Sequence, residues 1–216
     1  MASFLVAFSA AFGAAEAIRA TQSRARKDEH RGRKNNLVIH CPKSSDHSQI
    51  LEGRNVVLSG DKLYVDTGTD PDLEFGHPFA GYFLAFPDTE HSGLVSTICD
   101  EPPIMNWIYV DCDTHELKFG TRPYAESNYT GPFDCTRQDR RLTLGSWEGF
   151  FAVREDSGFW ALYFDVDQDR LGSKLSKETP ILEVQLLRVE LQVQHPHEET
   201  SEKHDTQEAT EVKVEI

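Results

Sequence analysis

The sequence predicts its fold most clearly at residues 148–165, which read EGFFAVREDSGFWALYFD. Two runs rich in Phe, Val, Trp and Tyr flank the turn at residues 155–158, and six of the 16 residues from 150 to 165 are aromatic. Aromatic and β-branched residues on both sides of a short Asp-Ser-Gly turn are typical of paired antiparallel strands. We therefore expect a β-hairpin with strands at 148–154 and 159–165.

The same pattern continues in both directions along the chain. Short apolar runs alternate with clusters of Gly, Pro, Asp and Asn from Leu37 to about Val193, and no helical period of useful length competes with them. Eleven strands are expected, near residues 37–41, 54–58, 62–66, 79–86, 93–98, 106–112, 116–119, 141–144, 148–154, 159–165 and 181–193. They predict a mainly β protein, an antiparallel β-sandwich or a small irregular barrel.

The apolar alternation changes phase within the last expected strand. Its apolar residues are Leu182, Val184 and Leu186, followed by Leu187, Val189, Leu191 and Val193. Because side chains on a strand alternate between two faces, this shift predicts a β-bulge at residues 186–187.

The charge divides the 216 residues into three parts. Residues 1–34 hold seven basic and three acidic residues, which gives this segment a net charge of +4. Residues 35–193 carry a net charge of −13 and residues 194–216 a net charge of −5, so the whole chain carries −14. We expect a helix with a basic arm at 1–34, a β-rich domain at 35–193 and an acidic disordered tail at 194–216. The body is too acidic to bind nucleic acid, which requires clustered cations.

The first segment has the pattern of an amphipathic helix. Phe4, Phe8 and Phe12 recur every four residues and form one stripe on a helix, and a basic arm follows them. An anionic membrane surface or an acidic protein partner would fit this segment, with contacts at Phe4, Phe8, Phe12, Arg24, Arg26 and Lys27. A retained helix would suit an intracellular, membrane-associated protein, whereas a cleaved signal peptide would suit the secretory pathway; a transit peptide or a weak membrane span is also open.

Several motifs resemble a family of uncharacterised proteins from filamentous fungi. They are the run PPIMNWIYVD at 102–111, Glu116–Gly120, Gly131-Pro132, Trp147–Phe150, Trp160–Asp165 and the arm RKDEHRGRK at 26–34. The resemblance covers roughly residues 24–190. It implies a shared fold and transfers no catalytic residue. It departs at Phe133-Asp134-Cys135, where the family's pattern has a Trp-rich Gly-Pro-Trp run.

The body offers aromatic residues for binding and few for catalysis. We expect a non-catalytic binding or interaction domain, with Trp107, Tyr109, Trp147, Phe150, Trp160 and Tyr163 as candidate ligand-binding residues. The alternative is a hydrolase-like or lectin-like β-sandwich of the secretory pathway that uses Asp100, Glu101 and Asp165. Nucleophile elbow, P-loop and dinucleotide motifs are all missing from the sequence.

No cofactor or metal ion is expected. The acidic run at 165–169 begins like a calcium loop, but Arg170 and Ser176 stand where the EF-hand needs Gly and Glu. The four cysteines, Cys41, Cys99, Cys112 and Cys135, form no CxxC pair, and Cys112 is expected to be a buried thiol on the face of Ile108 and Val110. Their disulfide state and the oligomeric state are left open.

Overall fold

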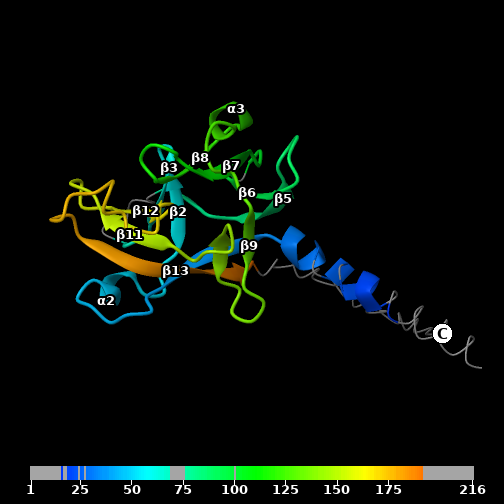
Figure 1. Ribbon diagram of the computed structural model, residues 1–216, viewed down its shortest axis with the longest axis horizontal. Coiled ribbons are helices and arrows are strands. Elements are labelled where there is room, and N and C mark those ends of the chain that lie inside the picture. The colour runs from blue at the N-terminus through cyan, green and yellow to red at the C-terminus, as the bar shows by residue number, and fades with distance from the viewer. Residues whose placement is uncertain are drawn as a thin grey trace, which may run out of the picture.

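The computed structural model describes residues 16, 19–23, 25–26, 28–68, 76–99 and 101–191 (Figure 1). The fold within them is mainly β, as predicted. Its strands are β1 Asn35–His40, β2 Val56–Ser59, β3 Lys62–Val65, β4 His77–Pro78, β5 Gly81–Ala85, β6 Ser92–Thr97, β7 Met105–Val110, β8 Leu117–Gly120, β9 Phe133–Cys135, β10 Leu142–Leu144, β11 Phe150–Arg154, β12 Trp160–Phe164 and β13 Ile181–Glu190. Two short helices, α2 at Ser48–Leu51 and α3 at Arg122–Ala125, join them.

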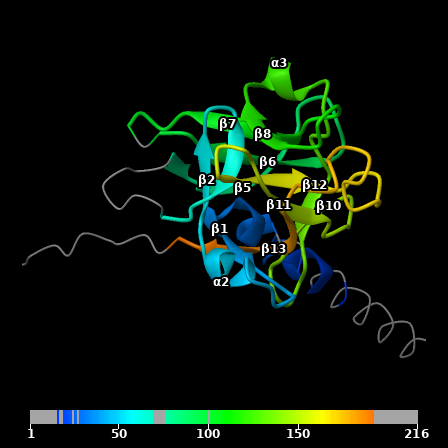
Figure 2. The same cartoon turned by 90° about the vertical axis from the view of Figure 1, so that its left-hand side faces the viewer.

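Six strands close into a barrel. β1 pairs with β13 along its whole length and with β5 at Asn35 and Gly81. β5 pairs with β6, and β9 pairs with β10. β6 contacts β9, and β10 contacts β13, where Arg141 bridges to Leu187. The ring β1–β5–β6–β9–β10–β13 therefore joins the first strand to the last. Figure 2 shows β1 and β13, which close the ring, side by side. Of the two predicted architectures, the structure adopts the barrel.

Three β-hairpins cover one end of the barrel and repeat at similar intervals. They are β2–β3, β7–β8 and β11–β12, and their first residues, Val56, Met105 and Phe150, lie 49 and 45 residues apart. The second strands meet one another: β3 pairs with β12 and with β8, and Glu116, just before β8, bridges to Tyr163 on β12. The chain thus builds one four-strand unit three times around a common axis.

Each hairpin sends apolar side chains into one shared core. The inward residues include Leu58 and Leu63 from the first hairpin, Ile108 and Leu117 from the second, and Phe150, Leu162 and Phe164 from the third. Phe79 and Phe133, which are almost fully buried, fill the barrel. Burial of this continuous apolar surface is the main favourable contribution to the stability of the fold.

Two sequence predictions on local structure are wrong. β13 pairs with β1 in an unbroken register through Leu186–Ile39, Leu187–Val38 and Arg188–Leu37, so residues 186–187 form no bulge. The inward position after Leu186 is occupied by Arg188, and Val189 is 49% exposed. Cys112 is exposed rather than buried, because β7 ends at Val110 and residue 112 belongs to the following turn.

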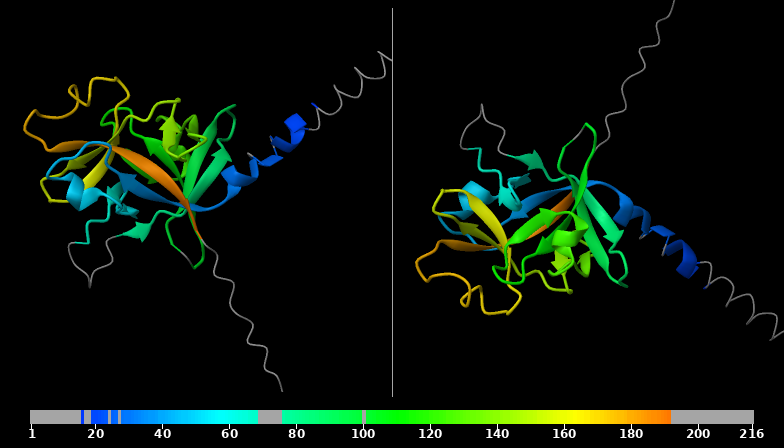
Figure 3. Two further views of the ribbon diagram at one scale, coloured as in Figure 1. Left: turned by 90° about the horizontal axis from the view of Figure 1, so that it is seen from below. Right: turned by 90° about the horizontal axis from the view of Figure 1, so that it is seen from above.

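The described residues before β1 are helical as far as Gly32. This helix leaves the barrel at the end where β13 stops (Figure 3). Arg31 holds it to the barrel through an ion pair with Asp134 and by lying over the ring of Phe83, with 4.5 Å from Cζ to the ring centroid. Among the described residues, no helix is long and apolar enough to cross a membrane.

Candidate functional site

The six candidate ligand-binding aromatic residues differ in how far their side chains are exposed to solvent. Five of the six are buried or half-buried: Trp107, Tyr109, Phe150, Trp160 and Tyr163. Phe150 belongs to the central core, where its ring packs edge-on against Phe164 at 5.0 Å between centroids. Trp147 is 45% exposed. It is therefore the member of the set best placed to meet a ligand from solution.

A two-residue turn presents Trp147 at the surface. Leu144 and Trp147 exchange both of their backbone N–H···O hydrogen bonds, at 3.0 Å each. The two residues between them, Gly145 and Ser146, have φ of 59° and 65°. Positive φ at both central residues is the type I′ geometry that joins tightly paired strands. The turn is thus a rigid support for the indole.

Gly149 sets the position of the indole. A Cβ added at Gly149 would lie 1.9 Å from Nε1 and 2.5 Å from Cδ1 of Trp147. The pyrrole edge of the ring therefore lies directly on the backbone of residue 149. Glu148 between them is held by an ion pair with Arg141, at 2.9 Å from Oε2 to Nε.

A hollow of about 220 Å³ lies beside Trp147. Its apolar lining includes Leu144, Phe164 and Val166, while exposed side chains of Tyr129, Trp147 and Gln168 also border it. We call Tyr129, Trp147, Gln168 and this hollow the aromatic shelf. An apolar surface bordered by an indole ring, a phenol and an amide suits a small ligand with both apolar and hydroxyl-rich faces.

A second, more polar hollow adjoins the aromatic shelf. It has a volume of about 470 Å³ and is lined by Glu90, His91, Ser92 and Ser146, among others. Gly145 and Ser146 are consecutive in the turn, and the first lines the shelf whereas the second lines this hollow. His91 is fixed by a 2.9 Å hydrogen bond between its Nε2 and Oγ1 of Thr130. A ligand longer than one ring could extend in this direction.

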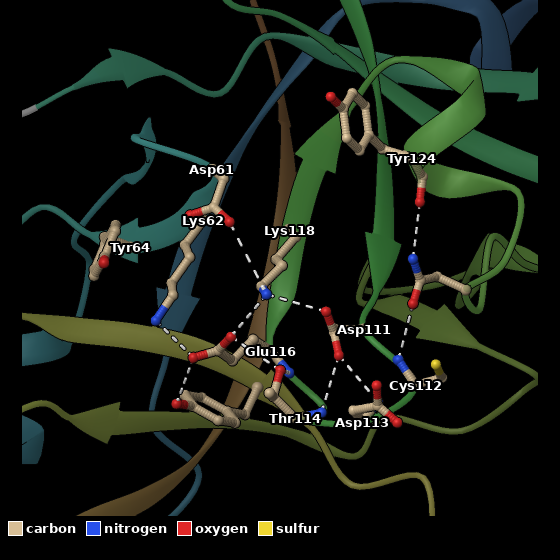
Figure 4. Close-up of polar contacts among 12 residues, drawn as sticks. Asp61, Lys62, Tyr64, Asp111, Cys112, Asp113, Thr114, Glu116, Lys118 and Tyr124 are labelled. Carbon is tan, nitrogen blue, oxygen red and sulfur yellow. Dashed lines mark hydrogen bonds and ion pairs between the residues drawn. The ribbon is translucent and has the colours of Figure 1, made fainter.

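A cluster of charged side chains occupies the point where the three hairpins meet (Figure 4). We call Lys62, Asp111, Glu116, Lys118 and Tyr163 the axial cluster. Oε1 of Glu116 accepts hydrogen bonds from Lys62 Nζ at 2.6 Å and from the hydroxyl of Tyr163 at 3.0 Å. Its Oε2 accepts from Thr114 Oγ1 at 2.9 Å and lies 3.2 Å from Lys118 Nζ. Every oxygen of this carboxylate is used, so the cluster holds the hairpins together.

The pKa values in the axial cluster reflect this pairing. Burial raises the pKa of Glu116, but hydrogen bonds from Lys62 and Thr114 outweigh it and hold the pKa below its ordinary value. For Asp111 burial also raises the pKa, but the Thr114 backbone N–H and the Lys118 ammonium lower it to about 2. Burial and the Glu116 charge raise the pKa of Tyr163. Both carboxylates are therefore ionised near neutral pH and serve as acceptors.

Acid is expected to weaken the fold through Asp111. A carboxyl whose folded pKa is about 2, against an ordinary 3.8, stabilises the protein above about pH 4 and loses this effect as the pH falls toward 2. The difference in free energy of unfolding between wild type and Asp111→Asn should therefore shrink between about pH 5 and about pH 2. Urea titrations at several pH values measure it. A difference that stays constant would contradict the assignment.

The structure describes two of the three acidic residues of the hydrolase-like alternative. Asp165 is 2% exposed, and its carboxylate accepts the backbone N–H groups of Asp169 and Arg170 at 3.1 and 2.9 Å. It caps the loop after β12. Glu101 is exposed, and Asp100 lies outside the described residues. The described part of the chain contains no group of three His, Cys, Asp or Glu that could hold a metal ion, and its four cysteines are free.

Most of the N-terminal residues predicted to contact a membrane or an acidic partner lie outside the described residues. Arg26 is exposed on the helix, whereas the other five, Phe4, Phe8, Phe12, Arg24 and Lys27, lie outside the described residues. Contact of this segment with an anionic membrane or an acidic partner stays a prediction.

Sequence reasoning missed Tyr129 and Gln168 as parts of the shelf. They lie 18 and 21 residues from Trp147 in the sequence, on opposite sides. Tyr129 is brought there by a bridge to Val110, and Gln168 by the loop after β12. Neither stands in a sequence motif that indicates binding, so only the closed barrel reveals them.

The comparisons with known proteins agree with this architecture. A family model described as "Fungal beta-trefoil domain" matches residues 13–192. Neither the curated proteins nor the solved structures contain a match. A six-stranded barrel covered by three hairpins, with one unit repeated three times, is the β-trefoil arrangement, and the fungal resemblance of the sequence motifs points the same way. The chain belongs to the fungal β-trefoil domain family.

Proposed function

We propose that this protein is a non-catalytic binding domain that holds a neutral saccharide against Trp147. β-Trefoil domains often bind carbohydrates or proteins. The observation that carries the proposal is the exposed indole of Trp147 beside a hollow bordered by Tyr129 and Gln168. A sugar ring has an apolar face of C–H groups that stacks on an aromatic ring and a rim of hydroxyls that needs donors and acceptors.

The size and charge of the shelf favour one uncharged sugar ring. The hollow of about 220 Å³ is below the roughly 300–1,000 Å³ typical of sites for drug-sized ligands. The Gln168 amide supplies two donors and an acceptor, and the Tyr129 hydroxyl supplies one donor. Because residues 35–193 carry a net charge of −13, their field opposes an acidic saccharide at this surface.

Loss of the indole is expected to weaken saccharide binding strongly without unfolding the protein. The experiment screens neutral oligosaccharides ending in galactose, mannose or N-acetylglucosamine and then measures affinity by calorimetry. Trp147→Ala should weaken binding at least about tenfold, because exposed tryptophans in contact with a ligand dominate binding energies. Tyr124→Ala removes an aromatic that is 71% exposed on α3 and should bind as wild type does.

Gly149→Ala provides a second arm of the same experiment. The new Cβ would push the indole off the backbone while leaving Trp147 present, so affinity should fall although the free energy of unfolding changes by less than about 1 kcal/mol. Failure of every saccharide to bind, or equal affinity in Trp147→Ala and wild type, would overturn the proposal.

A further inference from the structure

A third hollow lies between the N-terminal helix and the end of the barrel, and it shares Arg31 and Asp134 with the polar hollow beside the aromatic shelf. Its volume is about 390 Å³, and four of its lining residues are arginines: Arg31, Arg33, Arg137 and Arg140. The facing acidic residues are Asp134 and Glu190. We call these six residues the arginine pocket. A concentration of guanidinium groups is unexpected on a protein whose net charge is −14.

The carboxylates neutralise only part of this charge. Arg31 pairs with Asp134. Arg33 pairs with Glu29 at 2.5 Å and with Glu190 at 2.8 Å, and Arg140 lies 3.7 Å from the same Glu190. Arg137 has no ion pair among the residues that the structure describes. Glu190 is thus shared by two guanidinium groups.

A fifth arginine, Arg188, is buried behind the pocket wall. It is 6% exposed and faces inward from β13, with its Cζ 4.1 Å from the centroid of the Phe83 ring. Its Nη1 donates to the thiol of Cys135, a pocket-lining residue, at 3.6 Å. In the described part of the chain, Nη2 has no hydrogen-bond partner. Burial lowers the pKa of Arg188, and the charges of Arg31 and Arg140 lower it further.

A buried guanidinium without a carboxylate is energetically costly. Removing a charge from water costs several kcal/mol unless a partner of opposite charge compensates, and contact with an aromatic ring or a thiol compensates only in part. Buried polar groups that lack a partner in a native protein commonly indicate a bound water or ion. The uncompensated charge of Arg188, which contacts the pocket-lining Cys135, therefore favours an anion in the adjoining pocket.

We propose that the arginine pocket binds a phosphate-bearing small molecule, with the phosphate held by Arg140 and Arg31, which line the pocket, and attracted further by the buried charge of Arg188 behind its wall. Four guanidinium groups line the pocket together with the carboxylates of Asp134 and Glu190, which leaves a net charge of +2. A phosphate monoester carries about −1.5 to −2 at neutral pH, and guanidinium groups bind its oxygens in pairs. The cavity is larger than one phosphate and leaves room for the group that carries it.

Phosphate is expected to bind the full chain and raise its melting temperature. The probes are inorganic phosphate and glucose 6-phosphate, measured by calorimetry and by thermal unfolding against chloride at equal ionic strength. Arg140→Gln should weaken binding at least about tenfold. Arg154→Gln makes the same charge change beside Pro180, at the other end of β13, and should leave binding unchanged.

Arg188→Met separates a binding role from a structural one. Methionine keeps an apolar side chain against Phe83 and removes the uncompensated charge, so the ligand-free variant should melt at or above the wild-type temperature and respond less to phosphate than the wild type does. The proposal is overturned if phosphate stabilises the wild type no more than chloride does. It is also overturned if Arg140→Gln responds to phosphate as the wild type does.

A vesicle experiment identifies the source of the phosphate. Binding of glucose 6-phosphate without sedimentation on phosphatidylcholine vesicles containing phosphatidylinositol 4-phosphate assigns the site to a soluble ligand. Sedimentation that requires Arg140 and the phosphorylated lipid assigns it to a lipid headgroup. Absence of both would contradict the proposal.

Discussion

Glu116→Ala is expected to lower the free energy of unfolding by about 3 kcal/mol. The carboxylate of Glu116 is 8% exposed and receives hydrogen bonds from side chains of all three hairpins or the turns next to them. Its removal leaves the buried hydroxyl of Tyr163 without its acceptor and Lys62 with one carboxylate in place of two. Breaking a buried ion pair from one side typically costs about 3–5 kcal/mol, and the partial exposure of Lys62 places this case at the lower end.

Urea unfolding followed by circular dichroism measures this effect. Glu116→Gln should cost less than Glu116→Ala, because an amide oxygen still accepts hydrogen bonds although the charge is lost. Glu126→Ala removes an exposed carboxylate that pairs with Arg122 and should change stability by less than about 1 kcal/mol. Equal stability of Glu116→Ala and Glu126→Ala would show that the axial cluster does not hold the hairpins together.

Gly81→Ala is expected to destabilise the barrel by about 3 kcal/mol. Gly81 lies where β5 pairs with both β1 and β6, opposite Asn35 and Ser96. A Cβ there would lie 2.3 Å from the carbonyl oxygen of Val95 and 2.4 Å from the ring of Phe79. The backbone oxygen cannot rotate away, so the strands must separate, and overpacking of this kind costs about 1–3 kcal/mol or more.

Gly32→Ala is the matched control for this substitution. Gly32 ends the described helix, and a Cβ there would meet nothing within 4 Å. Alanine also favours a helix over glycine by up to about 1 kcal/mol, so this variant should be as stable as wild type or slightly more stable. Thermal unfolding of both variants measures the contrast. A Gly81→Ala protein with wild-type stability would be incompatible with the close approach of β5 and β6.

Alternation of apolar residues predicted most strands because it depends only on neighbours in the sequence. The hairpin at 148–165 forms β11 and β12 with Phe150 opposite Phe164. β9 was missed because it has only three residues, with Asp134 in the middle. The threefold repeat was missed because its units share geometry rather than residues: VVLS in β2 corresponds to MNWIYV in β7. Closure by β1 and β13 is a long-range contact that no local pattern indicates.

Residues of the candidate sites could be predicted only where the residue type itself suggests binding. Trp147 was singled out as an aromatic residue, whereas its burial state and its neighbours Tyr129 and Gln168 depend on the closed barrel. Arg188 gave a signal that was misread. The apolar residues Leu187 and Val189, out of phase with Leu186, indicated a bulge, but the strand is regular and turns the guanidinium of Arg188 inward.

The indole N–H signals of nitrogen-15-labelled protein test the binding proposal most directly. The chain has three tryptophans: Trp147 is exposed, Trp107 is half-buried and Trp160 is in the core. Titration with the saccharide that binds most tightly should shift the Trp147 signal in a saturable manner and leave the Trp160 signal in place. A Trp147 signal that stays unchanged at saturating saccharide would contradict the account.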